Sequence, residues 1–222
     1  MSHFETFMAR DGHAFQAYLA RPAAGVRGAV VVLQEIFGLT PHILAMADGF
    51  AAAGYLAIAP ALFDRVRRGL VLGDSGDDIE RARGYRQQIQ TAKAMLDIAA
   101  AVAVARHSGK VAAVGYCWGG TLAWLAATEL SLGAAVCYYG SGIAEHLDKV
   151  PACPTQLHFG QRDASIPPAA IERIRGAYPH GEYCLYAAGH GFNNEGRPAH
   201  YDVAAATLAR ERTREFLAQH IG

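Results

Sequence analysis

Residues 114–120 read VGYCWGG, a glycine-rich turn with Cys117 at its centre. A run of valine, alanine and glycine, residues 110–115, leads into the turn, and the apolar segment 121–127 leaves it with helical spacing. Glycines two positions before and two after Cys117 are typical of the strand-to-helix turn that presents a nucleophile. The start of a helix also favours the thiolate form of a cysteine. The turn alone is equally compatible with a structural cysteine.

Strands and helices alternate along the rest of the chain. The hydrophobic pattern predicts a hairpin at 3–9 and 14–20, strands at 28–35, 54–62, 110–115, 133–139, 153–159 and 182–187, and helices at 41–53, 79–106, 119–130, 167–177 and about 200–220. Residues 64–78 carry mixed charge and several glycines and are expected to form a surface loop. This alternation indicates the α/β class, with a mostly parallel central sheet, helices on both faces and an N-terminal hairpin. In such sheets ligands bind beyond the carboxyl ends of the strands.

The composition indicates one globular domain spanning residues 1–222. Hydrophobic residues make up 52% of the chain and charged residues 18%, and the 20 Lys and Arg balance the 20 Asp and Glu. A nucleic-acid partner is not expected, because such proteins usually carry a basic excess. No apolar run is long enough to span a bilayer and no signal peptide is evident, so we expect a cytoplasmic protein without a membrane partner. The four cysteines form no C-x-x-C pair, which argues against a zinc site and for reduced thiols.

Two further polar residues follow predicted strands. Asp163 comes after the strand that ends at Gly160, and His190 follows the last predicted strand between two glycines. Alone, Asp163 fits a turn-closing carboxylate and His190 is one of ten histidines. Together with Cys117 they occur in the chain order of the α/β-hydrolase triad, each directly past a strand. We therefore assign Cys117, Asp163 and His190 as the candidate catalytic residues. By contrast, His158 fits the core of a strand, and we expect His200 on the surface.

The segment after the first buried strand, residues 34–38, occupies the place from which an α/β hydrolase takes an oxyanion N–H group. The expected donors are the backbone N–H groups of Ile36 and of Trp118, the residue after the nucleophile. Glu35 is unusual in this segment, because a carboxylate near a thiol disfavours the thiolate. Its alternative interpretation is a helix-capping or salt-bridged residue.

With these motifs assembled, the chain resembles the dienelactone hydrolase family, in its branch with a cysteine nucleophile. The resemblance is carried by QEIFGL (34–39), GYCWGG (115–120), Asp163 after HFG, and GHGFNN (189–194). It implies an α/β-hydrolase fold and an esterase of the carboxymethylenebutenolidase type that needs no metal or organic cofactor.

The resemblance also implies a role for each residue of the site. Cys117 attacks the carbonyl of a small lactone or ester and forms a thioester, His190 moves the proton, and Asp163 orients His190. Glu35 hydrogen-bonds the resting thiol, and substrate binding rearranges that contact so that the thiolate forms.

Substrate recognition in the family uses an arginine and a tyrosine four residues apart. Arg81 and Tyr85 match this spacing, which places them on one face of a helix, where they would bind a substrate carboxylate. Phe37 is a further candidate substrate contact. Family members also place a serine directly after the histidine and an arginine four residues after it, but here these positions are Gly191 and Asn194. A second carboxylate-binding residue is therefore missing, unless Arg197 takes its place.

Two other interpretations stay open at this point. A class I amidotransferase-like or DJ-1-like thiol enzyme also combines a cysteine in a sharp turn with a glutamate. A non-catalytic binding protein on an α/β-hydrolase scaffold is the second alternative. The natural substrate and the oligomeric state do not follow from the sequence.

Overall fold

The computed structural model describes residues 2–222, and the chain forms two compact units. The first unit ends at Val111 and the second covers Ala112–Gly222. Each unit combines helices with parallel strand pairs, which confirms the predicted α/β class. The single domain over residues 1–222 stays a prediction. Among the described residues, no helix combines the length and the apolar character needed to cross a membrane.

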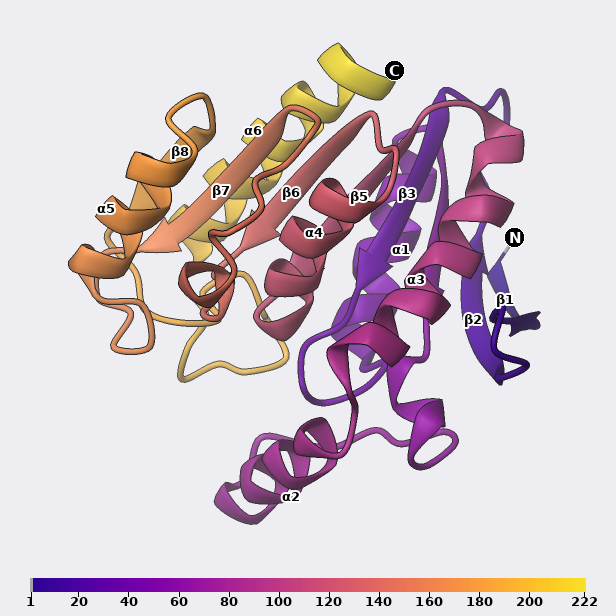
Figure 1. The fold of residues 1–222 in the computed structure, drawn as a ribbon, viewed down its shortest axis with the longest axis horizontal. Coiled ribbons are helices and arrows are strands. Elements are labelled where there is room, and N and C mark those ends of the chain that lie inside the picture. The colour runs from indigo at the N-terminus through magenta and orange to yellow at the C-terminus, as the bar shows by residue number, and fades with distance from the viewer. Residues whose placement is uncertain (1) are drawn as a thin grey trace. The chain divides into compact units, whose positions relative to one another are not determined.

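The first unit contains the predicted hairpin and two central strands. Its elements are β1 (Ser2–Met8), β2 (Ala14–Ala20), β3 (Gly28–Leu33), α1 (Pro41–Ala52), β4 (Tyr55–Pro60), the short 3₁₀ helix η1 (Leu62–Arg65), α2 (Gly76–Gln87), α3 (Thr91–Ala105) and the 3₁₀ turn η2 (Arg106–Ser108). The strand order is β1-β2-β4-β3, with β3 and β4 parallel and the other pairs antiparallel. Helices α1 and α3 lie on opposite faces of these strands (Figure 1).

The burial of these strands follows from their sequences. Every residue of β3 and β4 is buried, as expected for β-branched and apolar runs covered on both faces. The edge strand β1 is mostly exposed and is joined to β2 by a turn in which Gly12 has a φ of 81°. The predicted Asp-Gly turn is therefore present.

The second unit contains four parallel strands in sequence order. Apart from Val111, which belongs to the first unit, its elements are β5 (Val111–Tyr116), α4 (Trp118–Glu129), β6 (Ala134–Tyr138), the 3₁₀ turn η3 (Ile143–Glu145), β7 (Thr155–Gly160), α5 (Pro168–Ala177), β8 (Glu182–Tyr186) and α6 (Val203–Ile221). Helix α4 lies in front of these strands and α6 behind them (Figure 1). From Trp118 to Ala127 every residue of α4 is buried, so this helix is a core element that begins at the candidate nucleophile. His158 in β7 is buried and His200 is exposed, as expected.

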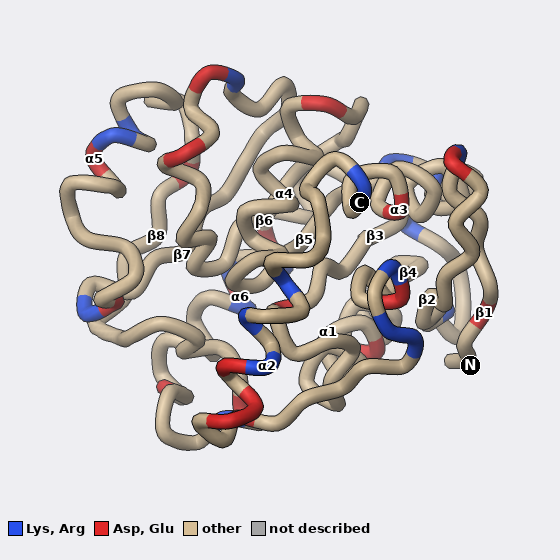
Figure 2. Tube along the Cα trace, turned by 60° about the horizontal axis from the view of Figure 1, so that its bottom comes forward, with Lys and Arg blue, Asp and Glu red and all other residues tan. Residues whose placement is uncertain are grey.

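The helix predicted over 79–106 is wrong as a single element. The structure has two helices, α2 and α3, with Gln90 in an extended conformation at the start of α3. Ile89 between them is buried, whereas α2 buries Ala82 and is rich in charge, with acidic residues in its first turn and a basic residue in its last (Figure 2). The two helices bury different faces, and the break at residues 88–90 lets the chain change direction between them. Alanine-rich spacing alone does not reveal the change of direction.

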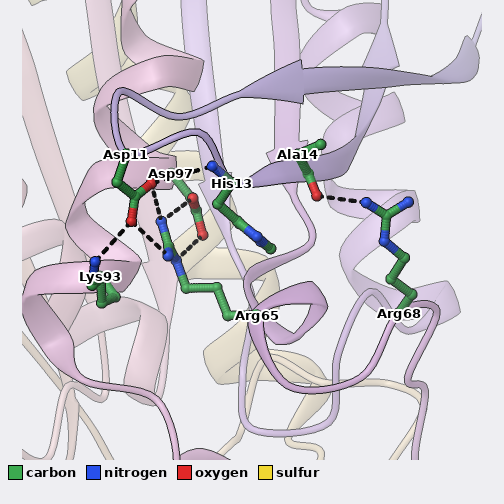
Figure 3. Close-up of polar contacts among 7 residues, drawn as sticks. All are labelled: Asp11, His13, Ala14, Arg65, Arg68, Lys93 and Asp97. Carbon is green, nitrogen blue, oxygen red and sulfur yellow. Dashed lines mark hydrogen bonds and ion pairs between the residues drawn. The ribbon is translucent and has the colours of Figure 1, made fainter.

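The segment 64–78, predicted as a surface loop, is held at its start by an ion-pair network. The Arg65 guanidinium donates to both carboxylate oxygens of Asp97 at 2.7 Å and to both oxygens of Asp11 at 3.1 and 3.2 Å. Lys93 also donates to Asp11, at 2.9 Å. Figure 3 shows Arg65 between the two carboxylates, which come from α3 and from the hairpin turn. The start of the loop is therefore fixed to two other elements of the first unit.

Candidate active site

The turn at residues 115–119 has the strained geometry that its glycines predict. Cys117 has φ 55° and ψ −114°, a conformation that L-residues rarely adopt. A Cβ atom on Gly115 would lie 1.9 Å from the carbonyl oxygen of Gly119, so no larger residue fits. The Cys117 N–H donates to the Tyr138 carbonyl at 3.0 Å, and the Cys117 carbonyl accepts from Gly120 at 2.9 Å. Strand β5 and helix α4 therefore meet at Cys117, which projects from a fixed backbone.

Three side chains from three strand ends meet in the second unit. The Nε2 atom of His190 lies 3.1 Å from the Sγ atom of Cys117, and its Nδ1 atom lies 2.6 Å from a carboxylate oxygen of Asp163. Cys117 follows β5, Asp163 follows β7 and His190 follows β8, so all three come from the carboxyl ends of parallel strands. Each distance is within hydrogen-bond reach, which is the geometry that proton transfer requires.

Asp163 is fixed by its own turn. Its side chain is buried, and the second carboxylate oxygen accepts the Ser165 N–H at 2.8 Å. The Asp163 N–H donates to Gly160, and its carbonyl accepts from Ile166. The turn-closing role and the contact with His190 are therefore both present, one on each carboxylate oxygen.

The surroundings of His190 favour a protonated imidazole. Burial lowers the pKa of His190, but its hydrogen bonds to Asp163 and Cys117 outweigh burial and raise this pKa to about 10. The imidazole side chain is 22% exposed, so solvent reaches the site. A histidine this basic beside a thiol favours transfer of the thiol proton to the imidazole.

Glu35, Ile36 and Phe37 lie in the first unit, between β3 and α1. Glu35 is 1% exposed and Phe37 is also buried. The cap of α1 is Thr40, whose hydroxyl accepts the Ile43 N–H, so Glu35 does not cap this helix. The helix-capping alternative for Glu35 is therefore wrong.

The loop after η1 fixes the backbone of this segment. Gly38 has a φ of 85°, and a Cβ atom there would lie 2.0 Å from the carbonyl oxygen of Leu70. The Leu72 N–H donates to the Phe37 carbonyl at 2.9 Å. The Gln34 side chain bridges the Leu62 N–H and the Glu35 carbonyl. Residues 34–38 and the loop therefore form one hydrogen-bonded structure.

Arg81 and Tyr85 lie on α2, as predicted, and a third residue joins them. The Arg67 guanidinium donates to the Tyr85 hydroxyl at 3.2 Å, and Arg81 pairs with Asp78 at 3.0 Å. The pKa of Tyr85 is lowered, first by the hydrogen bond from Arg67 and then by the charges of Arg67 and Arg81. The sequence analysis missed Arg67, because a loop residue has no spacing that relates it to a helix face.

At positions 191 and 194 this chain differs from the serine and arginine of the family pattern, and the structure explains both differences. Gly191 has a φ of 77°, where a serine would be strained. Asn194 is buried, and its side-chain oxygen accepts the Gly196 N–H at 3.0 Å, so this residue closes a turn. An added Cβ on Gly191 would lie 3.9 Å from a guanidinium nitrogen of Arg197, which places Arg197 beside the histidine turn. Within residues 2–222, no group of three or more His, Cys, Asp or Glu side chains could hold a metal ion.

Comparisons with known proteins extend over nearly the whole chain. The sequence profile described as "Dienelactone hydrolase family" matches residues 15–221. A protein named carboxymethylenebutenolidase from Pseudomonas putida is 36% identical over 220 residues, which cover 94% of this chain and 92% of that protein.

Solved structures are similar along the same length. A crystal structure from Klebsiella pneumoniae, assigned as a dienelactone hydrolase, superposes with a TM-score of 0.85 at 31% identity and covers 99% of this chain and 98% of the other. The Pyrococcus furiosus esterase Pf2001 shares the fold at a TM-score of 0.74 and 13% identity, covering 100% of this chain and 93% of its own. These similarities confirm the predicted α/β-hydrolase fold.

Proposed function

Since the chain belongs to the dienelactone hydrolase family, we propose that it hydrolyses a small lactone or carboxylic ester through Cys117, His190 and Asp163. Membership makes the chain a hydrolase of the dienelactone hydrolase type, which favours this function over the amidotransferase-like and binding-protein alternatives. The observation that carries the proposed mechanism is the 3.1 Å contact between His190 Nε2 and Cys117 Sγ.

In the proposed reaction His190 Nε2 takes the thiol proton, and the Cys117 thiolate attacks the substrate carbonyl carbon. The tetrahedral intermediate collapses when the C–O bond to the leaving alkoxide breaks and this oxygen takes the proton from His190. A thioester remains. Water then loses a proton to His190, attacks the thioester and releases the carboxylic acid, and the proton returns to the Cys117 sulfur.

Two backbone N–H groups would stabilise the oxyanion of each tetrahedral intermediate. Trp118 opens α4 directly after Cys117, and the start of a helix favours negative charge. Ile36 is the second proposed donor, and the contacts of Gly38 and Phe37 with the loop hold its segment in one conformation. Preorganised donors of this kind are commonly the largest single contribution to catalysis.

Asp163 would keep His190 in the tautomer that protonates at Nε2 and would stabilise the imidazolium. This role follows from the 2.6 Å contact with Nδ1, and the Ser165 N–H on the other oxygen keeps the carboxylate from turning away. For Glu35 we propose the role that the family resemblance implies, a hydrogen bond to the resting thiol that substrate binding breaks. The burial of Glu35 supports a role in the site, since a buried carboxylate needs a polar partner.

The proposed substrate carries a carboxylate. Arg81 and Tyr85 would bind it, and Arg67 would supply the second guanidinium that position 194 lacks. A planar guanidinium matches a carboxylate bidentately, which suits a small anionic ester or lactone. Phe37 stays a proposed contact for the apolar part of the substrate.

Hydrolysis of p-nitrophenyl acetate by Cys117→Ala tests the nucleophile. We expect the variant to lose at least about 10³-fold in kcat, because the acyl group has no acceptor. Cys184→Ala is the matched control: this buried thiol lies on β8, and its substitution should leave turnover in place. Equal activity of Cys117→Ala and the wild type would contradict the proposed mechanism. A thioester trapped on Cys117 and found by mass spectrometry would support it directly.

A further inference from the structure

Among residues 2–222 two residues other than glycine have a positive φ, Cys117 at 55° and Tyr139 at 38°. They follow neighbouring parallel strands, in which Tyr116 pairs with Tyr138 at the last position of the register. The Cys117 N–H donates to the Tyr138 carbonyl, directly before Tyr139. Left-handed backbone is rare for a bulky residue and persists only where the surroundings impose it. The two strained residues are therefore side by side at the active-site ends of β5 and β6.

The turn that holds the nucleophile also holds Tyr139. A Cβ atom on Gly140 would lie 2.9 Å from both the Gly120 carbonyl carbon and the Thr121 nitrogen, so the backbone after Tyr139 lies directly against the first turn of α4. The Tyr139 N–H donates to the His158 carbonyl at 2.8 Å. Contacts on both sides therefore impose the conformation of Tyr139.

This conformation places the Tyr139 ring against the catalytic histidine. Tyr139 is 0% exposed, its ring centroid lies 5.2 Å from that of His190, and the two planes are inclined by 61°. Phe192 packs against the same ring at 5.3 Å and 72°. Inclined pairs at these distances are a favourable aromatic arrangement. A cation that lies over the face of a tyrosine ring, within about 6 Å of its centroid, is also attracted by the ring quadrupole.

We propose that Tyr139 is a positioning residue of the reaction, which holds the His190 imidazole between Cys117 and Asp163 and stabilises its protonated form. The inference rests on the proposed function, in which His190 Nε2 carries the proton that leaves the Cys117 sulfur and later returns to it. Titratable or charged groups near His190 include Asp163 and Cys117, which bond it, and Arg197 and His200, which lie beside Gly191. Substitution of Tyr139 leaves all of these groups in place, so the effect of its ring on the titration of His190 can be measured separately.

The test compares Tyr139→Leu with Tyr139→Phe and with the control Tyr138→Leu. Tyr138 is as buried as Tyr139, but its ring stacks on His158 instead of His190. The readout is the titration midpoint of the His190 ring by NMR, assigned from the signal that His190→Gln lacks. We expect Tyr139→Leu to lower this midpoint by about half a pH unit, since the imidazolium loses the ring. In p-nitrophenyl acetate hydrolysis the variant should lower kcat more than it raises KM.

Tyr139→Phe keeps the ring and should retain the wild-type midpoint, as should Tyr138→Leu. A His190 midpoint that is unchanged in Tyr139→Leu would overturn the inference. An equal shift of this midpoint in Tyr139→Phe or in Tyr138→Leu would overturn it as well. If Tyr139→Leu does not fold, Tyr139→Asn replaces it, because asparagine tolerates a left-handed backbone. The titration needs no turnover. A wild-type protein that hydrolyses no ester would therefore contradict the proposed function and leave this measurement decisive for Tyr139.

Discussion

The Arg65 guanidinium grips both carboxylate oxygens of Asp97, each at 2.7 Å, and Asp97 is completely buried. Removing the cation leaves a buried carboxylate without its partner. We expect Arg65→Met to lower the free energy of unfolding by about 3–5 kcal/mol in urea titrations. The double variant Arg65→Met/Asp97→Leu should lose much less, because it removes both charges.

Arg83→Met is the control for this pair. Arg83 forms an exposed ion pair with Glu80 on α2, so its loss should cost about 0–1 kcal/mol. If Arg65→Met and Arg83→Met had equal free energies of unfolding, the buried ion pair would contribute no more to stability than the exposed one.

Asp97 also predicts a pH dependence of stability. Burial raises its pKa from 3.8 to about 6, against the opposing effect of Arg65. Between these values the folded state binds more protons than the unfolded state, so ionisation of Asp97 lowers the free energy of unfolding as the pH rises. In Asp97→Asn this decrease should be absent between about pH 4 and pH 6. Urea titrations across that range would measure the difference between variant and wild type.

The pKa of Asp11, in the same ion-pair network, is shifted in the opposite direction from that of Asp97. Hydrogen bonds from Arg65 and then Lys93 hold the pKa of Asp11 well below its usual range. Its stabilising contribution is present above the ordinary aspartate pKa and is lost as the pH falls further. The stability difference between wild type and Asp11→Asn should therefore narrow on acidification below about pH 4. A difference that narrows instead between about pH 4 and pH 6 would show that the two carboxylates have been assigned the wrong way round.

Gly115→Ala tests the packing of the nucleophile turn. The added methyl group would meet the Gly119 carbonyl oxygen at 1.9 Å, and both atoms belong to elements fixed in the core. We expect a loss of about 1–3 kcal/mol or more in stability, together with a loss of esterase activity. Gly49→Ala in α1 is the matched control, because nothing lies within 4 Å of an added Cβ there. That variant should gain about 0.5–1 kcal/mol. A fully active Gly115→Ala would mean that the turn relaxes easily.

Arg67→Gln tests the substrate class. Loss of this guanidinium should raise KM for carboxylate-bearing esters roughly tenfold and leave neutral esters unchanged. Arg68→Gln is the control, because the Arg68 guanidinium donates to the Ala14 carbonyl and not to Tyr85. Equal effects on anionic and neutral esters would remove Arg67 from carboxylate recognition.

The sequence predicted the strands, the sharp turn at Cys117 and the positions of Cys117, Asp163 and His190 just past strand ends. Strand ends and sharp turns leave local signals in a sequence, and this is why they could be predicted. A local pattern of apolar residues identifies β5 or β7 without knowledge of its neighbours. The meeting of the three side chains then followed from the parallel topology.

Other features depend on contacts that no local pattern encodes. The break between α2 and α3 reflects which face each helix buries. Arg67 reaches Tyr85 from a loop, and Tyr139 acquires its strained backbone from the neighbouring strand and helix. Each of these features is decided by tertiary packing, which outweighs local propensity.

The close approach of Gly38 to the Leu70 carbonyl couples the loop that carries Arg67 to the segment of the proposed oxyanion donor Ile36. The loop that carries Arg67 cannot change its path at Leu70 without also moving the peptide that follows Ile36 and Phe37. Insertions or loop exchanges between Leu62 and Leu72 should therefore alter turnover along with substrate preference. Substitutions on α2, whose buried residue is Ala82, should instead change substrate preference without moving that peptide.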